Sequence, residues 1–166
     1  AYAWPEPDPA LIARTIDGTP ARFDAGTHTR LEAAQVLPAL FHPSELVCAG
    51  PDSETAIVRP LEESVTDAHL QQFIVVNPMR GRQSVNREGA PSVRCQANVL
   101  PRRHLVAEFD DRTLSKTQQA RLISKLAEFV PLRMVVDSGG KSLHAWFHVE
   151  RLNVRDQARF FAVACL

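Results

Sequence analysis

Two short motifs in the second half of the chain contain side chains that can carry out chemistry. In the first motif, Glu108 and Asp110 are separated by one apolar residue at the end of an apolar run. In the second motif, residues 138–144 read SGGKSLH and combine two glycines with lysine, serine and histidine. A pair of acids can hold a divalent metal ion, and a glycine-bearing turn with lysine can hold phosphates. Together the two motifs indicate metal-dependent phosphate chemistry on nucleotides.

The acid pair lies on a predicted strand, residues 103–110. Alternate residues of a strand share a face, so Leu105, Ala107 and Phe109 form an apolar face, while Glu108 and Asp110 lie on the other. Two neighbouring carboxylates repel each other unless a cation lies between them, and Mg²⁺ or Mn²⁺ prefers such oxygen ligands. The alternative is that both acids are solvated or pair with arginines.

The second motif is predicted to be the turn of a hairpin formed by residues 133–137 and 143–149. Lys141 and Ser142 lie at this turn, where backbone N–H groups can also bind anions. Trp146 and His148 share a face with His144, and for these two we favour sheet packing and a partly buried position over a binding role. A P-loop is excluded, because Val135 occupies the position of its first glycine and a strand follows the lysine.

The elements that must position these motifs predict an α+β fold, with a mostly antiparallel sheet flanked by helices. A capping box at Ser115–Gln118 begins a helix that runs to Val130. A second capping box, Thr29–Glu32, begins another helix, which Pro38 should kink or end. The first ten residues, with three prolines, are predicted to form an arm. The remaining predicted elements are three strands and a final helix, at residues 46–49, 55–59, 72–76 and 155–166.

Local charge is more informative than the net charge, which is zero. Residues 79–102 are polar, contain five arginines against the single acid Glu88, and predict a long functional or disordered loop. Arginines can follow a nucleic-acid backbone by contacting its phosphates. The alternative for this loop is a solvated segment. The candidate nucleic-acid-binding residues are Arg80, Arg82, Arg102, Arg103 and Arg133.

The composition narrows the setting in which the protein works. The three cysteines form no CxxC pair, which argues against a zinc site or a disulfide framework and favours a reducing cytoplasm. An apolar run of 18 residues is absent, so we expect no membrane span. The chain stops within the apolar predicted helix 155–166, which leads us to expect further sequence beyond Leu166.

Taken together, these residues resemble the archaeo-eukaryotic primase superfamily, which includes primase-polymerases and plasmid or phage replication primases. Its first motif is a pair of acids separated by one hydrophobic residue, as in Glu108-Phe109-Asp110, although the first acid there is more often Asp. Its second motif is Ser-x-His at a glycine-bearing hairpin, as in Ser142-Leu143-His144. The resemblance covers residues 103–150. It implies an RRM-like unit at residues 103–166, which would be the catalytic subdomain for metal and nucleotide, preceded by an N-terminal α/β part at 1–102.

The resemblance implies a two-metal nucleotidyltransferase with Mg²⁺ or Mn²⁺ as cofactor. Its partners would be a nucleoside triphosphate, a single-stranded or primed DNA template, and a helicase as partner or fused domain. The metal ligands would be Glu108 and Asp110. The catalytic residues would be the same two acids together with His144. The nucleotide's phosphates would contact Ser138, Lys141, Ser142 and His144.

One part of the superfamily pattern is missing. A third acid on a later strand completes the metal site in that family, and neither Glu150 nor Asp156 lies in the expected place. Either the missing acid lies in sequence beyond Leu166, or this chain is not a competent polymerase by itself. Two other interpretations stay open: a non-catalytic replication-initiation or nucleic-acid-binding module, and a metal-dependent phosphoesterase or nuclease.

Overall fold

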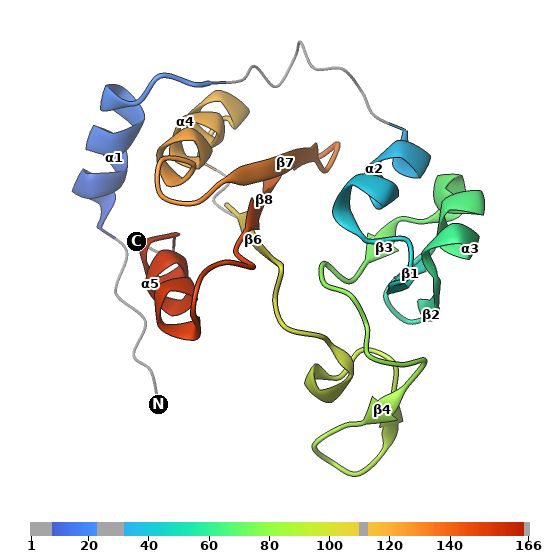
Figure 1. The fold of residues 1–166 in the computed structure, drawn as a ribbon. Helices are drawn as coiled ribbons and strands as arrows, with labels where there is room; N and C mark the ends of the chain where they lie inside the picture. Colours follow the sequence, from blue (N-terminus) through green and yellow to red (C-terminus); the bar gives the residue numbers. More distant parts are fainter. Residues whose placement is uncertain (1–7, 23–31, 110–112, 165–166) are drawn as a thin grey trace. The chain divides into compact units, whose positions relative to one another are not determined.

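The computed structural model describes residues 8–22, 32–109 and 113–164. The chain divides into two compact units. Unit 1 combines Ala1–His28 with Arg103–Leu166, and unit 2 is Thr29–Arg102. Both units contain helices and antiparallel strands, so the predicted α+β class with helices flanking antiparallel sheets is confirmed (Figure 1).

Unit 1 is built on an antiparallel sheet in the order β6-β8-β7. The strands are β6 (His104–Glu108), β7 (Leu132–Asp137) and β8 (Leu143–His148). The predicted hairpin is therefore confirmed. Its core side is apolar because Ala145, Phe147 and Val149 alternate along and just beyond β8, and all three are buried.

Helices cover the apolar side of this sheet. The helix α4 (Lys116–Leu126) buries Ala120, Ile123 and Leu126 in the same cluster as β8. Its N-terminus is the predicted capping box, in which Ser115 and Gln118 each accept a hydrogen bond from the other's backbone N–H. The last described helix, α5 (Val154–Ala164), contributes Phe160, whose ring lies 4.9 Å from that of Phe147.

The first helix, α1 (Pro9–Gly18), differs from two predictions. It begins at Pro9, because Asp8 accepts hydrogen bonds from the backbone N–H groups of Ala10 and Leu11, so residues 9 and 10, which were predicted to belong to an arm, are helical. It also belongs to unit 1 instead of the N-terminal α/β part. The reason is a long-range contact on α4, where Arg121 Nη1 donates to the carbonyl of Ile16 at 2.9 Å.

Unit 2 contains the sheet β2-β1-β3 and two helices. The predicted capping residue Thr29 lies outside the described residues, and the helix begins after Glu32, which forms a capping box with Gln35. Pro38 lies inside this helix, which ends at Leu40. The elements are α2 (Ala33–Leu40), β1 (Leu46–Gly50), β2 (Ile57–Pro60), α3 (Leu61–Thr66), a 3₁₀ turn (Ala68–Leu70) and β3 (Phe73–Ile74).

The predicted loop at residues 79–102 has more structure than its composition indicates. It contains a two-stranded hairpin and a 3₁₀ turn, namely β4 (Ser84–Val85), β5 (Pro91–Ser92) and η2 (Gln96–Asn98). Near its two ends, Met79 and Val99 pair with each other, and Met79 also pairs with Leu46, the first residue of β1. The segment is therefore anchored to the unit 2 core at both ends.

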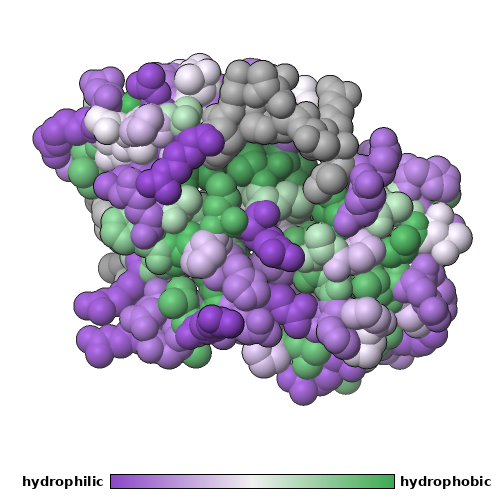
Figure 2. Space-filling view, turned by 45° about the horizontal axis from the view of Figure 1, so that its top comes forward, coloured by the Kyte–Doolittle hydropathy of each residue, from purple (hydrophilic) through white to green (hydrophobic). Residues whose placement is uncertain are grey.

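The surface carries both polar and apolar side chains, as Figure 2 shows for one face. Among the exposed apolar residues are Phe129 and Val154 in unit 1 and Ile57 in unit 2. Within the described ranges, every helix is too short or too polar to cross a membrane.

Candidate active site

The strand pairing brings the two motifs together. In the antiparallel register of β6 and β8, Glu108 lies directly opposite His144. The predicted division into two faces is confirmed: Leu105, Ala107 and Phe109 pack against the apolar cluster of unit 1, and Glu108 lies on the other face.

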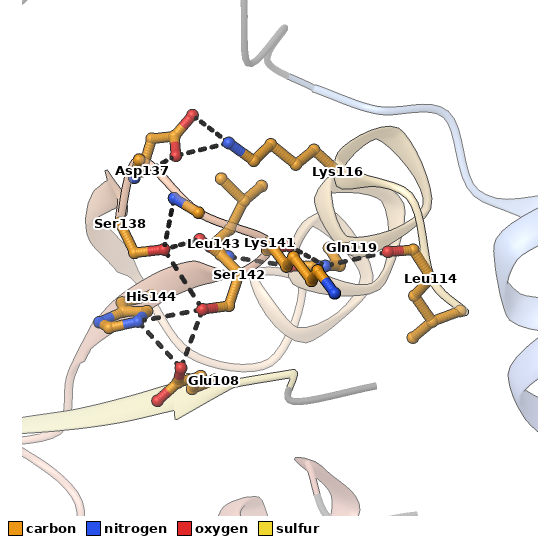
Figure 3. A network of polar contacts seen from close by, with 12 residues as sticks. Glu108, Leu114, Lys116, Gln119, Asp137, Ser138, Lys141, Ser142, Leu143 and His144 are labelled. Atoms are coloured by element: carbon orange, nitrogen blue, oxygen red, sulfur yellow. Dashed lines mark hydrogen bonds and ion pairs between the residues drawn. The ribbon is translucent and has the colours of Figure 1, made fainter. Parts of the chain in front are cut away.

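Three side chains meet at this end of the sheet. The Ser142 hydroxyl donates to Oε1 of Glu108 at 2.9 Å, and Nε2 of His144 lies 3.1 Å from the same oxygen. The Ser142 hydroxyl also lies 3.3 Å from His144 Nε2, so the three groups form a closed polar triangle (Figure 3). The Glu108 side chain is 47% exposed and that of His144 33%, which leaves the triangle open to a ligand.

This triangle differs from a hydrolase triad. In a Ser-His-acid relay, the acid binds one ring nitrogen of the histidine and the serine binds the other. Here Glu108 and Ser142 both contact Nε2 of His144. The arrangement therefore does not activate Ser142 as a nucleophile, and it fits a cluster that orients a carboxylate.

A buried glutamine on α4 holds the hairpin turn in place. Gln119 is fully buried, and its Nε2 donates to the carbonyls of Lys141 at 2.8 Å and Leu114 at 3.2 Å. Its Oε1 accepts from the backbone N–H of Leu143 at 2.8 Å. The backbone on both sides of Ser142 is therefore tied to α4. Gln119 is not among the residues predicted from the sequence, although a glutamine one turn before Leu122 and Ile123 on the apolar face of the helix is a usable signal.

The turn itself is closed by its own side chains. Gly139 has φ 76°, a conformation that favours glycine, and its N–H donates to Oδ1 of Asp137 at 2.9 Å. The N–H of Gly140 donates to Ser138 Oγ at 3.4 Å, and Ser138 Oγ donates to the carbonyl of Ser142 at 2.9 Å. The expectation that turn N–H groups bind an anion therefore does not fit this structure, because the two glycine N–H groups already have acceptors.

The two lysines near the turn differ in whether they have an ionic partner. Lys141 is exposed, and its Nζ has no ion-pair partner among the described residues. By contrast, Lys116 Nζ contacts both carboxylate oxygens of Asp137, at 2.7 and 2.8 Å (Figure 3). Lys141 is therefore the lysine of the turn that can meet a phosphate.

The predicted metal ligands are placed only in part. Asp110 lies outside the described residues. Ser142 and His144 both contact Oε1 of Glu108, so Oε2 is the oxygen that can take a cation within the described part of the chain. A hard carboxylate oxygen of this kind fits Mg²⁺ or Mn²⁺. The described ranges hold no group of three His, Cys, Asp or Glu side chains that could bind a metal ion.

Among the acids that the structure describes, none is placed to supply a third ligand. Asp137 pairs with Leu143 in the β7–β8 register, and Leu143 is a core residue, so Asp137 lies on the sheet face opposite Glu108. Glu150 follows the other end of β8, where it contacts Arg103 at 3.5 Å. Asp156 accepts a hydrogen bond from Asn153 near the start of α5. The sequence predicts neither Glu150 nor Asp156 at the metal site, and the positions of both residues in the structure agree with this.

The aromatic residues beyond the triangle are packing residues. Trp146 is buried, and its ring centroid lies 6.0 Å from that of His104. His148 is half-buried and lies 5.5 Å from His104. These positions agree with the favoured interpretations, which are sheet packing for Trp146 and a surface or partly buried histidine for His148.

The five candidate nucleic-acid-binding arginines are divided between the units. Arg80, Arg82 and Arg102 are exposed in unit 2, whereas Arg103 and Arg133 belong to unit 1. Arg103 contacts Glu150, and Arg133 is exposed at the irregularity of the β7–β8 pairing.

Of the cysteines, Cys48 is buried, which raises the pKa of its thiol and disfavours a reactive thiolate.

Comparisons with protein-family models, curated proteins and solved structures give no match to this chain.

Proposed function

We propose that this chain is a nucleotidyltransferase of the primase-polymerase type, which extends a primer on a DNA template during replication or repair. The observation that carries the proposal is the meeting of Glu108, Ser142 and His144 on one sheet face. These residues come from two motifs separated by the whole of α4. The order of the motifs and their strand contexts match what the resemblance to archaeo-eukaryotic primases implies.

Divalent metal ions held by Glu108 and Asp110 would activate the primer hydroxyl and neutralise the triphosphate. The described residues support this role through Glu108, whose Oε1 is held by Ser142 and His144. A carboxylate fixed through one oxygen keeps the other in a constant position for a cation. Ser142 is thus a positioning residue for Glu108.

Lys141 and His144 would bind the triphosphate of the incoming nucleotide. The ammonium group of Lys141 is a mobile point charge that suits phosphate oxygens. Nε2 of His144 carries the hydrogen when it donates to Glu108, and the same N–H can donate to a phosphate oxygen once the nucleotide is bound. Ser138 would act through the turn, since its hydroxyl already donates to the carbonyl of Ser142.

A second candidate function is a nucleic-acid-binding module that does not catalyse nucleotide addition. One observation favours it: the described residues contain no cluster of three metal-ligating side chains. Such a module would bind DNA with an affinity that falls with salt and needs no metal.

The two candidates separate in an extension assay with the purified chain, a primed single-stranded template and labelled dNTPs or NTPs, titrated with Mn²⁺ and Mg²⁺. The test variant is Glu108→Gln, which keeps the shape of the side chain and removes its charge. The matched control is Glu62→Gln, an exposed glutamate on α3 of unit 2. We expect metal-dependent extension that falls by about 100-fold or more in Glu108→Gln and stays within about twofold in the control.

Extension that persists in Glu108→Gln would refute the assigned role of that residue. Template binding without any extension would support the binding module. Shortened template strands in place of extended primers would indicate a nuclease.

A further inference from the structure

Unit 2 gathers exposed arginines around one buried asparagine. Asn98 is only 1% exposed, and its Nδ2 donates to the carbonyls of Gly81 and Val93, both at 2.9 Å. Its Oδ1 accepts from the N–H of Gly81 at 3.1 Å. Gly81 lies between Arg80 and Arg82, and Val93 precedes Arg94. One side chain therefore brings two arginine-bearing stretches of the chain together.

The β4–β5 hairpin, which belongs to the same segment as Asn98, is also held in a defined shape. Asn86 Oδ1 accepts from the N–H groups of Glu88 and Ala90 and closes the turn between β4 and β5. Nη2 of Arg87 donates to Gln96 at 3.1 Å, which ties this turn to η2. The guanidinium of Arg94 lies 5.5 Å from the ring centroid of Phe73. The segment thus presents its arginines from a preformed framework.

Three arginines of this segment have no acidic partner among the described residues, whereas Arg94 lies close enough to Asp52 to help lower the pKa of that carboxyl. Within the described residues, Arg80 and Arg82 have no acidic partner, and Arg87 bonds a neutral amide. All three are exposed. Uncompensated guanidinium groups on a fixed backbone suit a partner with repeated negative charges, since Arg binds phosphates with fixed geometry.

We propose that residues 79–102 form a preformed surface that binds the phosphodiester backbone of nucleic acid without metal, through Arg80, Arg82, Arg87 and Arg94. This inference deepens the proposed function, because it names the surface that would hold the template. A phosphodiester backbone fits better than an apolar partner because the segment has five exposed arginines and the large apolar side chain of Val85 as its main exposed hydrophobic residue.

The test measures binding of the full chain to fluorescent oligonucleotides in EDTA by anisotropy, at several salt concentrations between about 50 and 200 mM. The ligands are single-stranded DNA, single-stranded RNA and duplex DNA, with vesicles of anionic and zwitterionic lipid as a further arm. The test variant is Arg80→Gln/Arg82→Gln/Arg87→Gln, which spares Arg94 and its contact with Phe73. The matched control is Arg151→Gln/Arg155→Gln/Arg159→Gln, three exposed arginines at and before α5 of unit 1.

We expect the test variant to bind at least one of the nucleic acids about tenfold more weakly, with a salt slope about 2 units shallower on a single strand, and the control to stay within about twofold. Comparison of the three nucleic acids identifies which one supplies the backbone. Equal losses in both triple variants would overturn the proposal in favour of diffuse charge attraction. Loss of binding to anionic vesicles alone would overturn it in favour of a membrane surface. Because the assay needs neither metal nor Glu108, unchanged binding by the test variant rejects this surface even where the wild-type chain extends primers. Arginine-dependent binding by a wild-type chain that extends no primer supports the surface and counts against polymerase activity of residues 1–166.

Discussion

Two irregular segments of this protein are each held by one buried amide side chain. In unit 1, Gln119 makes three hydrogen bonds around the turn that carries Ser142. In unit 2, Asn98 makes three hydrogen bonds within the arginine segment. An amide offers both donor and acceptor groups, so it can satisfy backbone groups that no strand or helix pairs. Gln119 and Asn98 share this chemistry. They differ in the part of the structure that fixes each side chain in place.

Gln119 is fixed by a hydrophobic core. It belongs to α4, whose neighbouring residues Ala120 and Ile123 are buried against the sheet. Asn98 instead belongs to the short 3₁₀ turn η2, inside the segment that it organises. A residue on a packed helix can place a turn with the precision that catalysis needs, whereas a residue within a loop keeps the loop compact. We therefore expect the two amides to fail in different ways.

The largest effect should follow Gln119→Leu. This variant fills the same space but leaves the buried N–H of Leu143 without an acceptor, and it frees the carbonyl of Lys141. We expect a loss of about 3 kcal/mol in the free energy of unfolding, from the unsatisfied N–H and the lost hydrogen bonds. Chemical denaturation measures this loss. The matched control is Thr117→Ala, on the exposed side of α4. Gln118→Ala would be unsuitable because Gln118 belongs to the capping box.

The same variant tests the positioning role of Gln119. Once the turn is released, Ser142 no longer holds Glu108 in one place, so kcat for extension should fall by about tenfold or more while KM for the primed template changes little. Gln119→Glu keeps the acceptor for Leu143 but places a carboxylate against the carbonyls of Lys141 and Leu114, so it should cost at least as much stability as Gln119→Leu. Full activity in a folded Gln119→Leu variant would contradict the positioning role.

A smaller effect on global stability should follow Asn98→Ala. Met79 and Val99 keep the ends of the segment anchored, so the residues between them can open and be solvated without unfolding of the unit 2 core. We expect less than about 1 kcal/mol of change in global unfolding, together with at least about tenfold faster amide exchange in residues 81–97. Hydrogen exchange followed by mass spectrometry measures this. A cooperative loss of about 3 kcal/mol would show that both amides act in the same way.

The strand faces of unit 1 could be predicted from the sequence, whereas the contacts of the two buried amides could not. The faces of β6 and β8 followed from strict alternation of apolar residues, and the pairing of Glu108 with His144 is a consequence of that alternation and the hairpin. The hydrogen-bond partners of Gln119 and Asn98 could not be assigned, because each side chain bonds backbone groups between 5 and 24 residues away in the chain. Neither contact leaves a periodic signal. The packing of α1 against α4 escaped prediction for the same reason, as Arg121 and Ile16 are 105 residues apart.

The turn between β1 and β2 differs from these two segments, because an exposed carboxylate accepts the hydrogen bonds there and no buried amide is involved. Asp52 Oδ1 accepts from the N–H groups of Glu54 and Thr55, both at 2.8 Å. The hydrogen bond from Thr55 is the main cause that holds the pKa of Asp52 below its ordinary value of 3.8. A lowered pKa in the folded state means that the charged form stabilises the fold above the ordinary value, and that this contribution is lost as the pH falls through the folded-state pKa.

Asp52→Asn isolates that charge, because asparagine keeps one acceptor oxygen for the same N–H groups. We expect a small loss of stability at neutral pH that shrinks below about pH 4, where the wild-type carboxylate becomes protonated. Urea denaturation of both proteins across this pH range measures the difference. Because Asp52 is exposed, its effect should be the smallest of the three, and a difference that grew on acidification would contradict the assigned cause. A turn held at the surface by charge then depends on pH, whereas the turns held by Gln119 and Asn98 depend on burial.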